Sequence, residues 1–409
     1  MVAINLKKAI AWLRLHASKP YGVYSLIALA ILLPMLRPGY IFALDMAFAP
    51  VIRLPEEVTS SYLFYTVLHA LNILIPSQVL QKGMLFSILL LAGLGMHALM
   101  RHFQIGQRTD SDYAAWSAYI SGTLYMINPF TYSRFMAGQF AVLLGYACLP
   151  FFARALLGFI ANPTTRSSLV LAVWAVIISI VSIHTLGLLA VLTGVTLAVS
   201  LYQYRRKRSH LTAIAKYGSI TILAFLISSS YWLIPLAGGS STTAQAINSF
   251  TAGDQQAFAT LGSTIADKVG NVLQLQGFWA EARNLFVLPQ EQLALWPLAL
   301  LAVWTLVAAG AVLLWKRGHQ KTVVIFAGSA VVAIVLAVTG APAWLSEHTP
   351  FFAGYREPHK FVGLVALAYA ILAGESAGAL LQRYNRQGKE AALSIVTVAL
   401  IVLPVIFTP

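Results

Sequence analysis

Residues 322–340 read TVVIFAGSAVVAIVLAVTG and contain no charged side chain. A helix of about 20 predominantly apolar residues is long enough to cross the hydrocarbon core of a bilayer. Similar apolar runs recur along the chain, and eleven of them are predicted to span the membrane: 21–36, 84–100, 113–130, 140–160, 169–182, 186–202, 213–236, 293–315, 322–340, 361–381 and 391–407. The sequence therefore predicts an all-α integral membrane protein, a polytopic helical bundle of about 11 transmembrane helices.

The composition of the whole chain supports this class. Of 409 residues, 59% are apolar and 10% are charged, whereas soluble proteins average about 45–50% apolar and about 25% charged residues. These values exclude an ordinary soluble domain, and they exclude a disordered chain, which is poor in apolar residues and rich in charge. The single cysteine, Cys148, has no partner for an intrachain disulfide. We therefore expect one transmembrane domain that comprises residues 1–409.

The Lys and Arg residues indicate how the spans are oriented. Four short loops, 101–112, 203–216, 316–321 and 382–390, are basic, and cytoplasmic loops carry an excess of Lys and Arg. With the N-terminus inside, the cytoplasmic side holds 19 basic and 3 acidic residues, and the outer side holds 8 basic and 9 acidic residues. Topology thus explains the net charge of +14, and no nucleic-acid partner is expected. We expect a multi-pass protein of the plasma (inner) membrane whose C-terminus lies outside, where a longer relative could carry a further domain.

The outer loops 37–83, 238–292 and 341–360 are long and carry polar residues that membrane orientation does not require. Any chemistry is therefore expected on the extracytoplasmic face. Between Glu56 and Ile75, apolar residues recur at helical spacing before Pro76. This pattern predicts an amphipathic helix that lies on the outer surface.

Asp45 is the only acidic residue in the first part of the first outer loop, residues 37–50. Its neighbours are Phe42, Leu44, Met46 and Phe48, and it follows the first span closely. Burial among these side chains would favour the protonated carboxyl group, and a carboxylate poised in this way can act as a general base. The alternative is an ordinary Asp at a turn or at the start of a helix.

A second candidate is the stretch 125–139, which joins the third and fourth spans. Asn128 precedes a proline, so the third helix ends or kinks there. Arg134 then lies near membrane depth with no acidic residue nearby in the sequence, and an arginine at that depth requires a partner. A lipid phosphate would serve, because its oxygens match the planar guanidinium. The alternative is an interfacial arginine that extends towards the headgroups.

The third candidate is the stretch 355–361, YREPHKF, directly before the tenth span. It packs two cations, an acid and an imidazole into five positions: Arg356, Glu357, His359 and Lys360 surround a proline that fixes the local geometry. Anchoring at the membrane interface is the alternative.

Two further ionisable residues lie within or between spans. His184 lies between the fifth and sixth spans, and Glu375 lies within the tenth. A carboxylate inside the membrane is by default a hypothesis for a functional site. The small residues Gly374, Ser376 and Gly378 instead favour close helix packing, with Glu375 hydrogen-bonded locally.

An early Asp in the first outer loop, the stretch 128–139 and the stretch 355–361 together resemble the GT-C class of integral-membrane glycosyltransferases. The resemblance is closest to the mycobacterial arabinofuranosyltransferases and the YfhO-like multi-spanning proteins. It implies a transferase that uses a polyprenyl-phosphate-linked sugar donor and a glycan or glycoprotein acceptor on the outer face, with membrane lipids as further partners. By position, Asp45 would match the catalytic acid of the family.

The resemblance also implies roles for the other candidates. Arg134, Arg356 and Lys360 would bind the lipid phosphate, and the supporting residues would be Asn128, Gln139, His184, Glu357 and His359. No metal ligand is assigned, because the only Asp-x-Asp pair, Asp110 and Asp112, falls in a cytoplasmic loop. No cofactor is certain from the sequence: a divalent metal stays open, but no outer Asp-x-Asp pair supports it.

Two other functions stay open on the sequence. A secondary transporter or a lipid-linked-glycan flippase would have discontinuous spans and buried ionisable residues at the membrane midplane, of which Glu375 is the clear example. A non-catalytic GT-C-like membrane scaffold would have no deep cavity, and substitution of Asp45 would leave it unaffected.

Overall fold

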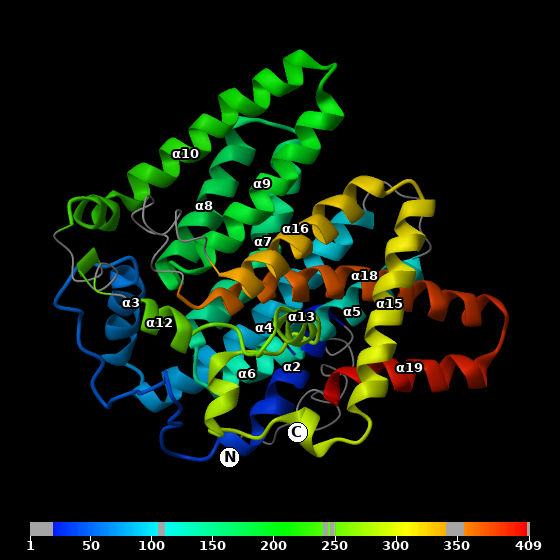
Figure 1. Cartoon of the computed structure of the whole chain (residues 1–409), viewed down its shortest axis with the longest axis horizontal. Helices are drawn as coiled ribbons and strands as arrows, with labels where there is room; N and C mark the ends of the chain where they lie inside the picture. The colour runs from blue at the N-terminus through cyan, green and yellow to red at the C-terminus, as the bar shows by residue number, and fades with distance from the viewer. Residues whose placement is uncertain are drawn as a thin grey trace, which may run out of the picture.

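The computed structural model describes residues 19–104, 111–239, 244–245, 249, 251–340 and 356–406. Over these residues the chain forms helices and no β-strand, apart from one isolated bridge between Ala43 and Met46. The helices, labelled as in Figure 1, are α2 (Pro20–Leu32), η1 (Leu33–Met35), α3 (Tyr62–Asn72), α4 (Ser77–Gln104), α5 (Ser111–Met126), α6 (Pro129–Met136), α7 (Phe140–Ala161), α8 (Thr165–Val181), α9 (Thr185–Tyr204), α10 (Arg208–Ala237), α12 (Ala252–Ala257), α13 (Ile265–Leu273), η2 (Trp279–Arg283), α14 (Pro289–Gln292), α15 (Trp296–Lys316), α16 (Gln320–Thr339), η4 (Pro358–Phe361), α18 (Val362–Arg386) and α19 (Glu390–Val405). The predicted all-α class is confirmed for the described part of the chain.

Seven of the described helices are long and apolar enough to cross a membrane: α4, α7, α9, α10, α15, α16 and the continuous unit of η4 and α18. The unit of α2 and η1, α8 and α19 are apolar but shorter, and α5 has 16 residues. Every predicted span coincides with a helix, but length and composition support seven spans and do not confirm the predicted count of about 11. The architecture is consistent with a helical membrane protein.

The loops are shorter than the sequence predicts. The basic loops 203–216, 316–321 and 382–390 reduce to the turns 205–207, 317–319 and 387–389, because the helices extend beyond their apolar runs into charged residues. At the first outer loop, α4 begins at Ser77 rather than near residue 84. The predicted amphipathic helix is present as α3, which begins after Ser61 rather than at Glu56 and contacts α4 and α8. Loop residues 105–110 and 341–355 lie outside the described residues.

The basic turns and the long loops lie at different ends of the bundle. In Figure 1 the turns that join α9 to α10, α15 to α16, and α18 to α19 lie at the upper and right ends of the view, whereas α3 and α12 lie at the left. These three basic turns are therefore separated in space from α3 and α12.

Helix α18 is the centre of the bundle: 17 of its 25 residues are buried, and it packs against α5, α15 and α16. Small residues permit these contacts. A Cβ atom added to Gly374 would lie 1.8 Å from Ser121 Oγ of α5, and one added to Gly310 of α15 would lie 1.8 Å from the carbonyl oxygen of Leu372. The close helix packing predicted around Glu375 is thus present.

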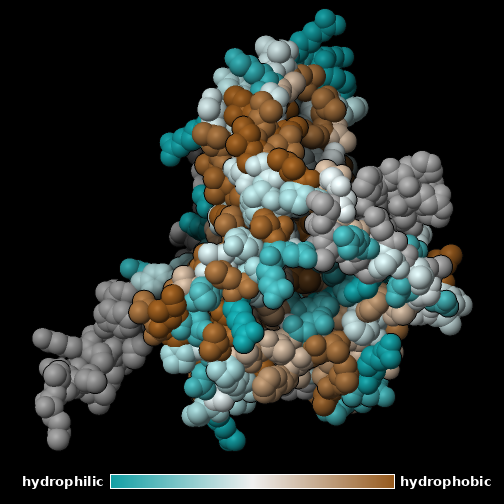
Figure 2. Space-filling model, turned by 90° about the vertical axis from the view of Figure 1, so that its left-hand side faces the viewer, coloured by the Kyte–Doolittle hydropathy of each residue, from teal (hydrophilic) through white to brown (hydrophobic). Residues whose placement is uncertain are grey.

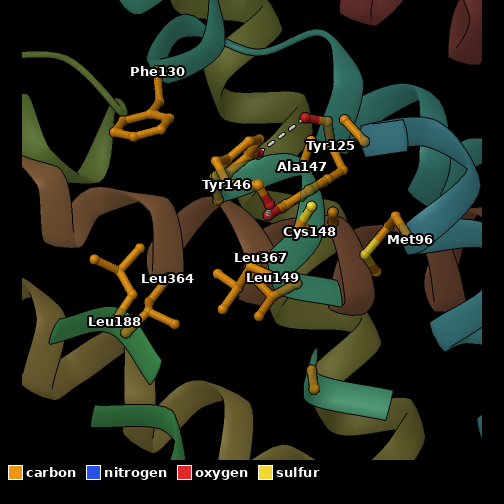
Figure 3. Packing of buried hydrophobic residues seen from close by; sticks show 14 of the residues in the cluster. Met96, Tyr125, Phe130, Tyr146, Ala147, Cys148, Leu149, Leu188, Leu364 and Leu367 are labelled. Atoms are coloured by element: carbon orange, nitrogen blue, oxygen red, sulfur yellow. Dashed lines mark hydrogen bonds between the residues drawn. The ribbon is translucent and has the colours of Figure 1, made fainter. Parts of the chain in front are cut away.

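A pair of tyrosines joins α5 to α7 next to the short helix α6. The rings of Tyr125 and Tyr146 are stacked, with centroids 4.1 Å apart (Figure 3). Each hydroxyl donates to the other residue's carbonyl oxygen, over 2.8 Å from Tyr125 and 2.9 Å from Tyr146. Both side chains are buried, so these paired hydrogen bonds satisfy their polar atoms and fix the two helices in register.

Candidate functional site

The chain reverses direction at α6, and Asn128 is the residue that starts this helix. Its Oδ1 accepts a hydrogen bond from Thr131 N, and its Nδ2 donates to the carbonyl oxygens of Leu124 and Tyr125. The following Pro129 occupies the first position of the helix, where its missing N–H costs nothing. Asn128, predicted as a supporting residue of the site, therefore holds the local backbone in place.

Arg134 of α6 is fully buried and is bonded by other parts of the chain. Its Nη1 lies 3.1 Å from Glu357 Oε2 and also donates to Gln139 Oε1, while Nη2 lies 3.0 Å from His359 Nδ1. The guanidinium carbon lies 3.8 Å from the ring centroid of Phe278. The acidic partner that the sequence analysis sought in a lipid phosphate is thus present in the chain itself, as the carboxylate of Glu357.

Arginine can only donate hydrogen bonds, and this fixes which atoms of Gln139 and His359 are donors and which are acceptors. Because arginine has no acceptor atom, Oε1 of Gln139 must face Arg134, and its Nε2 donates to Asp45 Oδ2 over 2.7 Å. For the same reason His359 Nδ1 must be an acceptor, and its Nε2 donates to the carbonyl oxygen of Gln276 over 2.8 Å. His359 is therefore held as the neutral tautomer with its proton on Nε2.

Asp45 lies at the outer end of the network, and its side chain is exposed. Its backbone N–H donates to the carbonyl oxygen of Ala137 over 2.9 Å, which fixes the turn against the end of α6. The expected burial of Asp45 among apolar neighbours is wrong, because Met46 and Phe48 pack against the core, whereas Phe42 and Leu44 are 73% and 48% exposed. The Asp45 carboxylate is therefore held by its hydrogen bond from Gln139 and is not buried.

Glu357 joins two cations. Its Oε2 lies 3.1 Å from Lys360 Nζ as well as 3.1 Å from Arg134 Nη1. Burial opposes its ionisation, but Lys360 and Arg134 outweigh that effect and hold the pKa of Glu357 well below its usual value. Burial, reinforced by the charge of Lys360, lowers the pKa of the neighbouring His184 to about 3. The site thus contains an ionised carboxylate and a neutral imidazole.

Arg356 lies beside this cluster and is partly exposed. Its guanidinium carbon lies 4.2 Å from the ring centroid of Phe258, which follows α12. A cation over an aromatic face is held by the ring quadrupole. The second outer loop therefore positions one of the predicted phosphate-binding residues.

The sequence analysis missed the contribution of residues 276–281 in that loop, QGFWAE. Phe278 is fully buried against Arg134, and Glu281 is buried with Oε1 2.8 Å from Ser133 Oγ and Oε2 2.9 Å from Gly277 N. Gly277 has a φ of 98°, which only glycine adopts readily, and this lets the segment turn into the bundle. An apolar run inside a polar loop was the signal that could have identified it.

Figure 2 views the face that carries α3 and α12. A hollow opens on this face, at about the height at which α12 and the start of α18 lie in Figure 1, and hydrophilic residues gather around it.

One hydrogen-bonded network joins six of the predicted residues, with His184 and Arg356 beside it: Asp45, Arg134, Gln139, Glu357, His359 and Lys360. Among the described residues, no group of three or more His, Cys, Asp or Glu side chains is arranged to hold a metal ion.

In comparisons with known proteins, no family model, no curated protein and no solved structure matches the chain.

Proposed function

We propose that the protein is a membrane glycosyltransferase, which transfers a sugar from a polyprenyl-phosphate-linked donor to a hydroxyl group of a glycan or glycoprotein acceptor. The observation that carries the proposal is the hydrogen-bonded link between an exposed carboxylate and a buried cationic cluster. Asp45 Oδ2 accepts a hydrogen bond from Gln139 Nε2, and Gln139 Oε1 accepts one from Arg134 Nη1. A base and cations in one network are what transfer from a phosphate-linked donor requires.

In the proposed reaction Asp45 takes the proton of the acceptor hydroxyl while the hydroxyl oxygen attacks the anomeric carbon of the donor. The bond between that carbon and the phosphate oxygen breaks, and the phosphate leaves with the electron pair. Arg356 and Lys360 stabilise the charge that accumulates on the departing phosphate. The protonated Asp45 then returns its proton to water.

Arg134 has a different role in this scheme from the one the resemblance implies. It is fully buried, and its Nη atoms are bonded to Gln139, Glu357 and His359. We assign it as a positioning residue that orients Asp45 through Gln139 and the η4 segment through Glu357. Direct phosphate contact then falls to Arg356, which is partly exposed, whereas Lys360 is buried in its ion pair with Glu357 and acts on the phosphate through its charge.

We place this reaction on the extracytoplasmic face of the plasma membrane. The support is the separation seen in Figure 1, where the basic turns lie away from the end that carries α3 and α12. Cytoplasmic loops carry the excess of Lys and Arg, so the opposite end, with Asp45 and Arg356, faces outward.

The test is a transfer assay with the full chain reconstituted in liposomes. It uses a panel of synthetic polyprenyl-phosphate sugars with hydroxyl acceptors, and it measures release of polyprenyl phosphate. Loss of a general base typically lowers the rate by about 100-fold to 10,000-fold, so Asp45→Asn should fall by that factor. Glu56→Gln, at an exposed acid of the same outer loop, is the matched control and should keep the wild-type rate. Turnover of Asp45→Asn at the wild-type rate, or no release from any donor of the panel, would refute the proposal.

A further inference from the structure

A surface groove of about 580 Å³ runs along α8, and none of its residues belongs to the Asp45 network. Its lining comes from one face of that helix and includes Arg166, Leu169, Val170, Val173, Trp174 and Ile177. The aliphatic side chains are open to the surroundings, since Val173, for example, is 54% exposed. The proposed transfer reaction makes no use of this groove.

The groove is charged at one end only. Arg166, the second residue of α8, is exposed and is the one ionisable side chain among the described lining residues. Ile177 marks the other end, about 17 Å away for a rise of 1.5 Å per residue, and the hydrocarbon part of one leaflet is about 15 Å thick, half of the bilayer core. The groove therefore has the length of one leaflet, with a cation at its end.

This charged end lies at the end of the bundle that carries the basic turns. Ser168 Oγ donates over 2.8 Å to the carbonyl oxygen of Tyr217, in the first third of α10, and α10 begins at the basic turn 205–207. The cation of the groove is thus placed towards the membrane surface at that end, and the aliphatic residues follow towards the midplane.

Arg154 of α7 supplies a second cation beside the groove. One turn before it, Phe151 stacks on Trp174 of the lining, with ring centroids 4.8 Å apart, and residues three apart share a face of a helix. Arg154 is exposed. At Gly158, one turn later, an added Cβ would contact nothing within 4 Å. Open space therefore adjoins Arg154 on the side of α7 that meets the tryptophan.

Both arginines call for an anion. Among the described residues, neither Arg154 nor Arg166 forms an ion pair with a carboxylate. Arg154 also lies seven residues before the end of α7, or roughly 10 Å along its axis, and an arginine within a spanning helix is costly without a partner. Phosphate oxygens match the planar guanidinium, and a phospholipid brings a phosphate and an apolar chain together.

We propose that this groove binds an anionic phospholipid, with one acyl chain along α8 and the phosphate between Arg154 and Arg166. The two cations select a head group of net negative charge, because the ammonium of a choline or ethanolamine head group would lie next to them. A lipid fits better than a protein segment, since the lining is aliphatic over the length of a leaflet and charged only at the head-group end. This inference does not depend on the proposed transferase activity.

The test measures which lipid stays bound to the full chain. The protein is placed in nanodiscs that contain equal amounts of phosphatidylglycerol and phosphatidylcholine, and native mass spectrometry quantifies the retained lipids. The wild type should retain phosphatidylglycerol about tenfold over phosphatidylcholine, the least effect expected for a hydrogen bond to a charged group. Equal retention of the two lipids would overturn the proposal.

Two arginine variants locate the head group. Arg154→Gln and Arg166→Gln should each lower phosphatidylglycerol retention about tenfold, because each removes a charge-assisted hydrogen bond. Arg383→Gln, at an exposed arginine near the end of α18, is the matched control and should keep the wild-type selectivity. If Arg383→Gln loses as much selectivity as the other two, the preference belongs to the general positive charge of that end, and the site is refuted.

A second pair of variants locates the acyl chain. Val173→Trp fills the groove and should lower retention of phosphatidylglycerol without altering either arginine. Val331→Trp is the control, because Val331 of α16 is exposed to a similar extent, 60%, and lies outside the groove. Equal retention by Val173→Trp and Val331→Trp contradicts the placement of the chain along α8.

Discussion

Gln139 donates a hydrogen bond to Asp45 over 2.7 Å, and the orientation of its amide is fixed from the other side by Arg134. Because the guanidinium can only donate, the amide nitrogen must face Asp45. The carboxylate therefore meets a hydrogen-bond donor at Oδ2, which leaves its second oxygen available for an acceptor hydroxyl. Three residues from two outer segments thus form one chain of hydrogen bonds between water and the buried Arg134.

Replacing Gln139 by Leu removes both hydrogen bonds at nearly constant volume. We expect the transfer rate to fall at least about tenfold, because the loss of one hydrogen bond to a charged group is worth about 1.5–3 kcal/mol, while KM for the donor stays near its wild-type value. Gln255→Leu, at an exposed position of α12, should change neither constant. An unchanged rate in folded Gln139→Leu would remove Gln139 and Arg134 from the positioning role.

The ion pair between Arg134 and Glu357 should be important for stability. Glu357→Gln leaves the fully buried Arg134 without its carboxylate, and breaking a buried pair costs about 3–5 kcal/mol. Lys360→Gln keeps that pair and should cost less. Thermal unfolding in detergent measures both, and a double-mutant cycle with Arg134→Gln should show coupling between Arg134 and Glu357. Additive effects in that cycle would contradict the contact.

The pH dependence of stability should carry the signature of His184. Its pKa is lowered to about 3 in the folded protein, whereas an unfolded histidine titrates near 6.5. Below pH 6.5 the unfolded chain binds more protons, so this residue should remove about 2 kcal/mol of stability by pH 5. His184→Asn should flatten the decline of the unfolding temperature between pH 7 and pH 5. A slope that stays the same in His184→Asn contradicts this prediction.

Glu357 should affect the pH dependence of stability only at a lower pH than His184 does. Its folded pKa is lowered, so its stabilisation is complete above the pKa of an unfolded glutamate, near 4.3, and is lost only as the pH falls further towards its folded pKa. The decline between pH 7 and pH 5 should therefore be unaffected by this carboxylate.

Gly138 should be essential for the position of Asp45. Its φ is 75°, and an added Cβ would lie 2.7 Å from Met46 Cβ and 2.9 Å from Met46 N. Gly138→Ala should therefore push the turn that carries Asp45 away from Gln139 and abolish transfer. Gly239→Ala is the matched control, because Gly239 also has a positive φ, 68°, but an added Cβ would contact nothing within 4 Å. If both variants lose the same amount of activity, backbone strain rather than contact with Met46 is responsible.

The long apolar helices could be predicted, because each is encoded locally by an apolar run of sufficient length. The partner of Arg134 could not, because Glu357 lies 223 positions further along the chain and no local pattern relates the two. The stretches that contain them were nevertheless identified, since charged side chains next to apolar spans are costly unless they are bonded. Glu281 and Phe278 were missed because an outer loop was treated as polar surface, whereas its apolar part folds into the bundle. The exposure of Asp45 depends on which way one turn faces, and sequence neighbours do not determine that.

Helix α18 also fixes the position of the residues that precede it. Lys360 lies two residues before Val362, the first residue of α18. Because α18 is enclosed by α5, α15 and α16 through contacts that leave no space for a methyl group at Gly310 or Gly374, it cannot shift without displacing those helices. The backbone of Lys360 is therefore held in place before any donor binds.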